Sequence, residues 1–402
     1  MVEVYSPALE ETITVNRIIN RIDGGSKGPT VVFFAGIHGN ETAGVFALEK
    51  ELKKLEGQKK DVKGTIYGIS GNLRALKAGK RFISEDLNRI WTKDRLNQLN
   101  NQNNHELEEK EQAELFKILT DILKTEQGPF YFIDFHTTSS KTIPFITIND
   151  AIINRRFSKL FPVPIVLGIE EYLNGPLLSY INELGYVSLG FESGQHDEIE
   201  AIKDSVAFIH LALLFAGCTI HSNFPEQSIY YDQLKNASKN MADIFEVIDL
   251  YGISEVDDFK MQPELKSFQE IEKGLFLATN NKERIYSAYN ARLFMPLYQN
   301  QGSEGFFVIR KIKPFYLKIS AIMRNWKMDG LLVLLPGINW EDESRKTLIA
   351  NLRIVKFLAK PIFHLLGYRN RQLTEDKIRL HNRERASKLD MYRNEFWFKN
   401  KE

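Results

Sequence analysis

The 402-residue sequence contains a single cysteine, Cys218, which excludes an intramolecular disulfide framework and any cysteine-rich zinc or iron–sulfur site. A metal must therefore be bound by histidine and carboxylate side chains, and the chain has eight histidines. An excess of charge is also missing, because 53 basic residues face 52 acidic ones. Without surplus positive charge to release counterions from phosphates, we expect no nucleic-acid partner.

Long hydrophobic runs are absent as well. The most apolar windows, residues 206–217 and 331–335, are far shorter than the roughly 20 residues that span a bilayer. The first residues lack the basic region and apolar core of a secretory signal. The sequence has neither a Gly-x-x-x-x-Gly-Lys-Ser/Thr phosphate loop nor a His-Glu-x-x-His helix. We therefore expect a cytoplasmic protein with no transmembrane segment.

Strand and helix patterns alternate along the first half of the chain. Thr30–Ala35 is a continuous apolar run, typical of a strand covered on both faces, and an amphipathic helix follows over 42–55. Further strands are predicted at 64–69, 130–135, 143–148, 164–167 and 186–191, and helices at 106–124, 177–184 and 197–215. This alternation predicts an α/β fold, with a mixed, mostly parallel sheet covered by helices. Ligands of such folds bind at the carboxyl ends of the strands.

Three parts are expected along the chain: an α/β domain over 1–225, a smaller β-rich domain over 226–330 and a helical C-terminal extension over 331–402. A helix over 227–248 should begin the second part, and alternating residues with Asn/Gly/Ser turns predict strands in the rest. In the extension, apolar residues three and four apart over 348–366 predict an amphipathic helix with a basic stripe. Such a helix suits packing on the second domain, a subunit interface of a homo-oligomer, or a membrane surface.

Metal-binding residue types follow two of the predicted strands. His38 and Glu41 come directly after Thr30–Ala35, with glycines close by that allow a sharp turn, and His136 follows the strand at 130–135. Two histidines and one carboxylate at strand ends can form a three-ligand zinc site whose fourth position is open, as in catalytic sites. Each residue also has an ordinary alternative, a solvated His-Glu pair or a histidine that caps a turn.

Four further residues can carry chemistry. Glu192 follows the strand at 186–191, where a carboxylate can take a proton from a metal-activated water or can simply favour the next helix through its dipole. Arg89 can bind a carboxylate bidentately, Asn88 can add a donor, and Arg81 can polarise a carbonyl group. A surface salt bridge is the ordinary alternative for each arginine.

Together these segments resemble the succinylglutamate desuccinylase and aspartoacylase family, a branch of the zinc carboxypeptidase-like enzymes. The resemblance covers the α/β domain well and the β-rich domain loosely. The matching segments, in family order, are Gly36-Ile-His-Gly-Asn-Glu41, Asn72-Leu-Arg-Ala75, Asp86-Leu-Asn-Arg89, Asp134-Phe-His-Thr-Thr-Ser139 and Gly190-Phe-Glu-Ser-Gly194.

The resemblance implies that residues 1–225 form a zinc-dependent catalytic domain. His38, Glu41 and His136 would bind one zinc ion per chain, and Glu192 would be the general base and acid. The implied reaction is hydrolysis of the amide bond of an N-acyl amino acid, a small acidic substrate, by a metal-activated water.

The substrate would be held by the cluster at 81–89. By the same resemblance, Arg81 would polarise the scissile carbonyl, while Asn88 and Arg89 would bind a substrate carboxylate. Aspartoacylases use a further arginine shortly before the catalytic glutamate, but residues 175–189 contain no arginine or lysine, and Phe306-Phe307 stands where a substrate-contacting tyrosine is expected. The resemblance therefore does not extend to specificity for N-acetylaspartate.

Two other functions remain open from the sequence. A carboxypeptidase-like hydrolase of a peptide or cell-wall fragment would use Asn88 and Arg89 for a C-terminal carboxylate. A catalytically silent, membrane-peripheral binding module would use the predicted helix over 348–366. The acyl group, the amino acid and the oligomeric state are not determined by the sequence.

Overall fold

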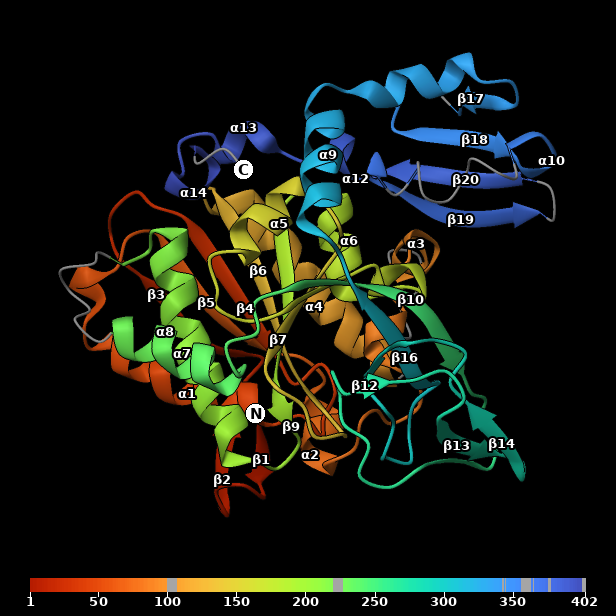
Figure 1. Cartoon of the computed structure of the whole chain (residues 1–402). Helices are drawn as coiled ribbons and strands as arrows, with labels where there is room; N and C mark the ends of the chain where they lie inside the picture. Colours follow the sequence, from red (N-terminus) through yellow and green to blue (C-terminus); the bar gives the residue numbers. More distant parts are fainter. Residues whose placement is uncertain are drawn as a thin grey trace.

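The computed structural model describes residues 1–99, 107–219, 227–341, 343, 345–355, 363, 365–374 and 377–399. Within these ranges an 11-stranded mixed sheet runs through the molecule (Figure 1). In spatial order its strands are β12 (Glu270–Ile271), β15 (Ala291–Phe294), β16 (Glu304–Lys311), β10 (Ile244–Gly252), β8 (Ile165–Leu167), β7 (Phe145–Ile148), β9 (Val187–Gln195), β6 (Phe130–Thr138), β4 (Thr30–Ala35), β5 (Thr65–Ser70) and β3 (Ile18–Asp23).

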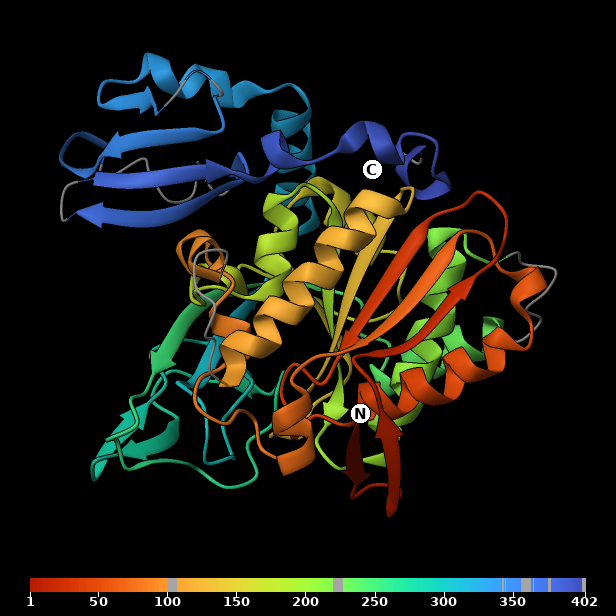
Figure 2. The ribbon, with the colours of Figure 1, turned by 180° about the vertical axis from the view of Figure 1, so that it is seen from behind.

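Helices cover both faces of this sheet, as Figures 1 and 2 show from opposite sides. In β4, Val31 and Phe33 join one apolar core, whereas Val32 and Phe34 join the other, which explains why the whole strand is apolar. The first core is covered by α1 (Ala43–Glu56), α5 (Ile152–Ser158) and α7 (Ile199–Ala216), and the second by α4 (Leu107–Thr125) and α6 (Leu177–Glu183). The predicted α/β fold is confirmed.

Strand register sets the position of the candidate site. β4, β6 and β9 are parallel neighbours, with Ala35 paired to Phe135 and His136 paired to Glu192. Because these strands end at one edge of the sheet, the segments that follow them meet there. The shorter elements of this half are β1 (Val2–Ser6), β2 (Glu11–Val15), η1 (Lys59–Asp61), α2 (Leu73–Ala78), η2 (Leu87–Arg89), α3 (Lys93–Leu99) and η3 (Ile169–Glu171).

The β-rich region continues the central sheet. The predicted helix over 227–248 is too long, because α8 (Gln227–Ala237) ends early and β10 then pairs in parallel with β8. Lys239 and Asn240 take left-handed backbone conformations that end the helix. A separate three-stranded sheet is formed by β11 (Phe259–Met261), β13 (Phe276–Asn280) and β14 (Glu283–Tyr286). The domain boundaries at 225 and 330 stay predictions.

The described part of the C-terminal extension combines a four-stranded sheet with short helices, so the prediction of a helical extension is wrong. After α9 (Pro314–Asn325) and η5 (Met328–Leu334), four strands form a sheet in the order β17-β18-β20-β19. The predicted amphipathic helix over 348–366 begins instead within β18, and residues 356–362, with much of the basic stripe, lie outside the described residues. The elements are β17 (Ile338–Trp340), β18 (Thr347–Asn351), α10 (Leu352–Val355), β19 (Tyr368–Thr374) and β20 (Lys377–Asn382).

A tertiary partner explains this difference. β18 pairs along its whole length with β20, and Leu348 and Ala350 are buried on the same face of the strand. The apolar residues of this segment lie two, three and four apart, so their spacing suits either a strand or a helix. Hydrogen bonding to β20 stabilises the strand.

The chain then returns to the half of the molecule that contains α5, as the dark blue segment of Figures 1 and 2 shows. It forms α12 (Arg383–Ala386), α13 (Leu389–Tyr392) and α14 (Phe396–Lys399). Tyr392 and Trp397 are buried in the core that contains α5, where both rings contact Tyr131. The C-terminal segment is therefore part of the core. None of the helices in the described ranges combines the length and the apolar character needed to cross a membrane.

Candidate metal centre and substrate pocket

His38 and Glu41 lie in the turn between β4 and α1. Gly36 begins this turn with a φ of 70°, a conformation that favours glycine. A Cβ atom on Gly39 would lie 2.0 Å from the backbone of Ala75, so only glycine allows the turn to pass so close to α2. Both side chains are buried, and the Nδ1 atom of His38 lies 2.7 Å from Oε1 of Glu41.

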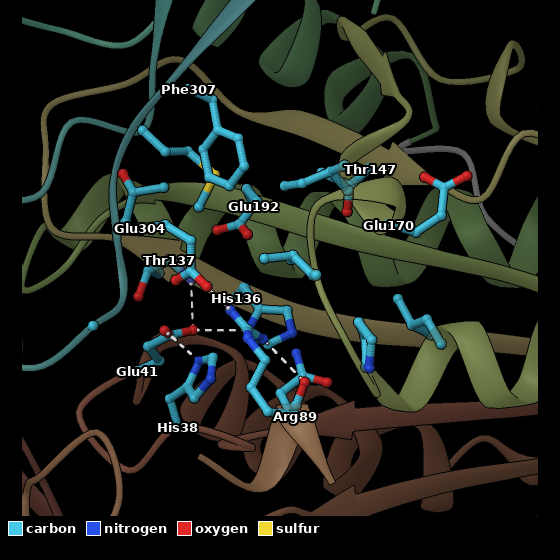
Figure 3. Close-up of a pocket in the computed structure, with 18 of the residues that line it drawn as sticks. His38, Glu41, Arg89, His136, Thr137, Thr147, Glu170, Glu192, Glu304 and Phe307 are labelled. Carbon is cyan, nitrogen blue, oxygen red and sulfur yellow. Dashed lines mark hydrogen bonds and ion pairs between the residues drawn. The ribbon is translucent and has the colours of Figure 1, made fainter. Parts of the chain in front are cut away.

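His136, near the end of β6, completes a cluster with these two residues. Its Nδ1 atom lies 2.9 Å from Oε2 of Glu41, and one ligand atom from each of the three residues lies within 4.8 Å of the others. Figure 3 shows the three side chains turned toward one another. The sequence-predicted ligands are thus brought together in a buried group that could hold a metal ion.

The outer nitrogens of both histidines contact carboxylates. Nε2 of His38 lies 3.1 Å from Oδ1 of Asp86, and Nε2 of His136 lies 2.8 Å from Oδ2 of Asp134. When each Nε2 donates its hydrogen to an aspartate, each neutral imidazole presents the lone pair of Nδ1 to Glu41.

The Nδ1 lone pairs and the Glu41 oxygens are all acceptors, so a cation or a proton must lie between them. These three side chains therefore fit a divalent metal, and Asp86 and Asp134 are the carboxylates that usually support metal-binding histidines. Although burial opposes it, His38 and His136 hold the pKa of the Glu41 carboxyl well below its usual range. Glu41 is therefore an ionised carboxylate that could bind a cation.

Arg81 reaches the same centre from the loop after α2. Its guanidinium lies 3.0 Å from Oδ2 of Asp86 and 3.4 Å from Oε1 of Glu41. Burial acts to lower the pKa of Arg81, but Asp86 and Glu41 raise it above its ordinary value, so the side chain stays charged. Its buried Nε has no hydrogen-bond partner among the described residues and leaves a donor for a ligand.

Glu192 lines the pocket above the cluster, on β9 next to His136 (Figure 3). Burial, aided by the negative charges of Glu41 and Asp134, raises the pKa of Glu192 to about 8, although His136 and Arg81 oppose the shift. In the residues that the structure describes, its Oε2 atom finds no hydrogen-bond partner. A carboxyl group with an elevated pKa and a free oxygen is suited to carry a proton.

Asn88 and Arg89 line the same pocket, but each already has a partner. Oδ1 of Asn88 accepts a hydrogen bond from the backbone N–H of Leu177, 2.9 Å away, at the start of α6. Arg89 forms an ion pair with Glu304 of β16, 3.1 Å away. A substrate carboxylate would have to share Arg89 with Glu304.

The sequence interpretation assigned no role to three residues in or near the pocket. Asp86 belongs to a quoted motif, so its position could have suggested that it supports His38. Glu304 carries no recognisable signal. His196 contacts Oγ1 of Thr137 at 2.7 Å and Oε1 of Gln299 at 3.1 Å, and it does not belong to the group of His38, Glu41 and His136.

Comparisons with known proteins agree with this arrangement. Residues 27–201 match the profile of the succinylglutamate desuccinylase/aspartoacylase catalytic domain. The succinylglutamate desuccinylase of Pseudomonas paraeruginosa (strain DSM 24068 / PA7) is 33% identical over 73 residues, which are 18% of this chain and 22% of that protein. That of Serratia proteamaculans (strain 568) is 39% identical over 61 residues, 15% of this chain and 19% of that protein. The chain thus aligns with less than a quarter of the length of either relative.

Solved structures share the fold over a larger part of the chain. A succinylglutamate desuccinylase/aspartoacylase from Rhodobacter sphaeroides superposes with a TM-score of 0.55 at 16% identity, covering 72% of this chain and 87% of its own. The product-bound ectoine utilization protein EutE (DoeB) from Ruegeria pomeroyi superposes with a TM-score of 0.52 at 17% identity, covering 75% and 88%. The family resemblance noted in the sequence is confirmed, because residues 27–201 match the catalytic-domain profile of the succinylglutamate desuccinylase/aspartoacylase family.

Proposed function

We propose that this protein is a zinc-dependent hydrolase that cleaves the amide bond of N-acyl amino acids. The observation that carries the proposal is the buried cluster of His38, Glu41 and His136. Its two imidazoles are oriented by carboxylates, and it opens on a pocket that contains Glu192. Two histidines and one carboxylate are a common ligand set of catalytic zinc.

The residues divide the chemistry among them. Zinc, when bound, would act as a Lewis acid toward the amide carbonyl and would acidify water. Glu192 would take a proton from the attacking water and deliver it to the amide nitrogen as the carbon–nitrogen bond breaks. The products are a carboxylic acid and a free amino acid, so atoms and protons balance.

Arg81 would stabilise the charge that develops on the carbonyl oxygen. Its Nε donor is buried and lacks a partner among the described residues, whereas its terminal nitrogens are occupied by Asp86 and Glu41. A donor held in place before the reaction requires no reorganisation in the transition state. Arg89 with Asn88, which line the same pocket, would orient a substrate carboxylate.

Metal content and one substitution test this function. We expect about one zinc ion per chain in the purified protein, as for a three-ligand catalytic site. A screen of N-acetyl, N-succinyl and N-formyl amino acids, read by the release of primary amine, should identify substrates. Peptides in the same screen test the carboxypeptidase-like alternative. Glu192→Gln should retain zinc and reduce turnover by several orders of magnitude.

Three results would contradict the proposal. A protein that contains no zinc and takes up none on addition has no such metal centre. A Glu192→Gln protein with unchanged turnover removes that residue from proton transfer. Release of C-terminal residues from peptides, with every N-acyl amino acid left intact, would favour the carboxypeptidase-like function.

A further inference from the structure

The pocket extends well beyond the metal cluster. Ser188 and Glu192 both line it, and they lie four residues apart on the same face of β9, a distance of about 13 Å along a strand. Figure 3 shows Glu170 on the opposite side of the pocket from His38 and Glu41. We call this part the distal end, lined by Thr147, Asn149, Glu170, Ser179 and Ser188.

Glu170 is the charged side chain of the distal end. It is 1% exposed, and its Oε1 lies 2.7 Å from Nη2 of Arg383 and 3.4 Å from the backbone N–H of Asp150. Its Oε2 is buried and finds no hydrogen-bond partner within the described residues. One oxygen of a buried carboxyl group is therefore left for a ligand that donates a hydrogen bond.

Positive charge in the pocket is confined to the metal end. Of the described residues, the arginines that line the pocket are Arg81 and Arg89, each paired with carboxylates near the metal cluster. The other four residues of the distal end carry hydroxyl or amide groups, and apolar side chains such as Ile148, Ile169 and Leu178 also line the pocket. Arg383 is paired with Glu170 but does not line the pocket, so an acidic group placed at the distal end would meet the Glu170 carboxyl with no arginine in the pocket wall beside it. Residues 175–189 likewise contain no arginine or lysine.

The C-terminal segment holds Glu170 in place. Arg383 pairs with Glu170 and also with Glu171, and Arg369 donates hydrogen bonds to the backbone oxygens of Glu170 and Leu173. Both arginines lie outside residues 27–201, the range that matches the family profile. This end of the pocket is therefore built partly by a region that the catalytic domain does not contain.

We propose that Glu170 makes the pocket selective for N-acyl amino acids whose side chain ends in an ammonium group. This inference rests on the proposed amide hydrolysis. With the amide at the metal cluster, a long basic side chain such as that of lysine or ornithine extends toward the distal end and donates to Oε2 of Glu170. A neutral side chain leaves this oxygen unsatisfied, and an acidic one is repelled.

Binding measurements test the selectivity without turnover. In a zinc-loaded Glu192→Gln background, calorimetry compares Nα-acetyl-L-lysine with Nα-acetyl-L-norleucine, which lacks the ammonium group, and with N-acetyl-L-glutamate. A hydrogen bond to a charged group predicts that the lysine compound binds on the order of 10- to 100-fold more tightly than the norleucine compound. The glutamate compound should bind most weakly.

Two substitutions isolate the carboxylate. Glu170→Gln keeps the shape of the side chain and should bring the lysine-to-norleucine affinity ratio close to one while the norleucine compound still binds, which shows that the pocket is folded. Glu171→Gln is the matched control, because Glu171 also pairs with Arg383 but does not line the pocket. It should retain the ratio of the unsubstituted protein.

The outcomes separate this inference from the proposed function. Equal binding of the lysine and norleucine compounds, tightest binding of the glutamate compound, no binding of the lysine compound, or an unchanged ratio in Glu170→Gln would each overturn the inference. Selective binding without hydrolysis in the protein that retains Glu192 would overturn the proposed function and leave the inference standing. Hydrolysis that favours acidic substrates would support the proposed function and overturn the inference.

Discussion

The hydroxyl group of Tyr392 joins the C-terminal segment to the strands that carry the candidate site. Tyr392 is fully buried, and its hydroxyl donates to the backbone oxygen of Phe130 at 2.5 Å and accepts from the backbone N–H of Val187 at 3.0 Å. Phe130 begins β6 and Val187 begins β9. One side chain thus satisfies two backbone groups at the starts of neighbouring strands.

Removing this hydroxyl should have a measurable cost. Tyr392→Phe keeps the ring in the core and leaves a buried carbonyl and a buried amide without this partner. Each unsatisfied group costs about 1–3 kcal/mol, so with two such groups we expect the free energy of unfolding to fall by about 2–6 kcal/mol. The metal cluster lies at the other ends of these strands, so the zinc content should not change.

Urea unfolding, followed by circular dichroism and tryptophan fluorescence, measures this difference. Tyr316→Phe is the control, because Tyr316 is 52% exposed, and it should change the free energy of unfolding by less than about 0.5 kcal/mol. If Tyr392→Phe unfolds within about 0.5 kcal/mol of the unsubstituted protein, the hydroxyl does not hold the strands and the reasoning fails. For the same reason, deletion of residues 340–402 should abolish soluble protein, whereas intact turnover would show that the segment is peripheral.

Three further predictions concern the core and the metal centre. Trp397→Ala should lower the free energy of unfolding by about 3–5 kcal/mol in the same urea assay, because the indole is buried against aromatic rings. Asp134→Asn should weaken zinc binding by about 10- to 100-fold in competition with a chelator, and an unchanged affinity would remove its role behind His136. Burial raises the pKa of Asp204 from an ordinary 3.8 to about 6, so the folded protein is destabilised as pH rises through this window. Asp204→Asn should therefore gain up to about 3 kcal/mol at pH 7.5 and nothing below about pH 4, as pH-dependent unfolding would show.

Local sequence determined the strands of the first half of the chain and the residues at their ends. Thr30–Ala35 is apolar throughout because both faces of β4 are covered, and this pattern is visible without a structure. Parallel strands end at one sheet edge, so His38, Glu41 and His136 could be grouped from their positions alone. The same reasoning predicted that Glu192 lies near them.

Only the tertiary structure decided which distant parts of the chain pair with these strands and with the residues of the pocket. The pairing of β18 with β20 converted a pattern that also suits a helix into a strand. Glu304 reaches Arg89 across 215 residues, and Arg383 reaches Glu170 across 213 residues. A strand partner or an ion pair of this kind depends on how the chain folds back on itself, which local periodicity does not encode. The sequence alone therefore determined which residues form the candidate metal site, whereas the folded chain decided which distant residues complete the pocket around it.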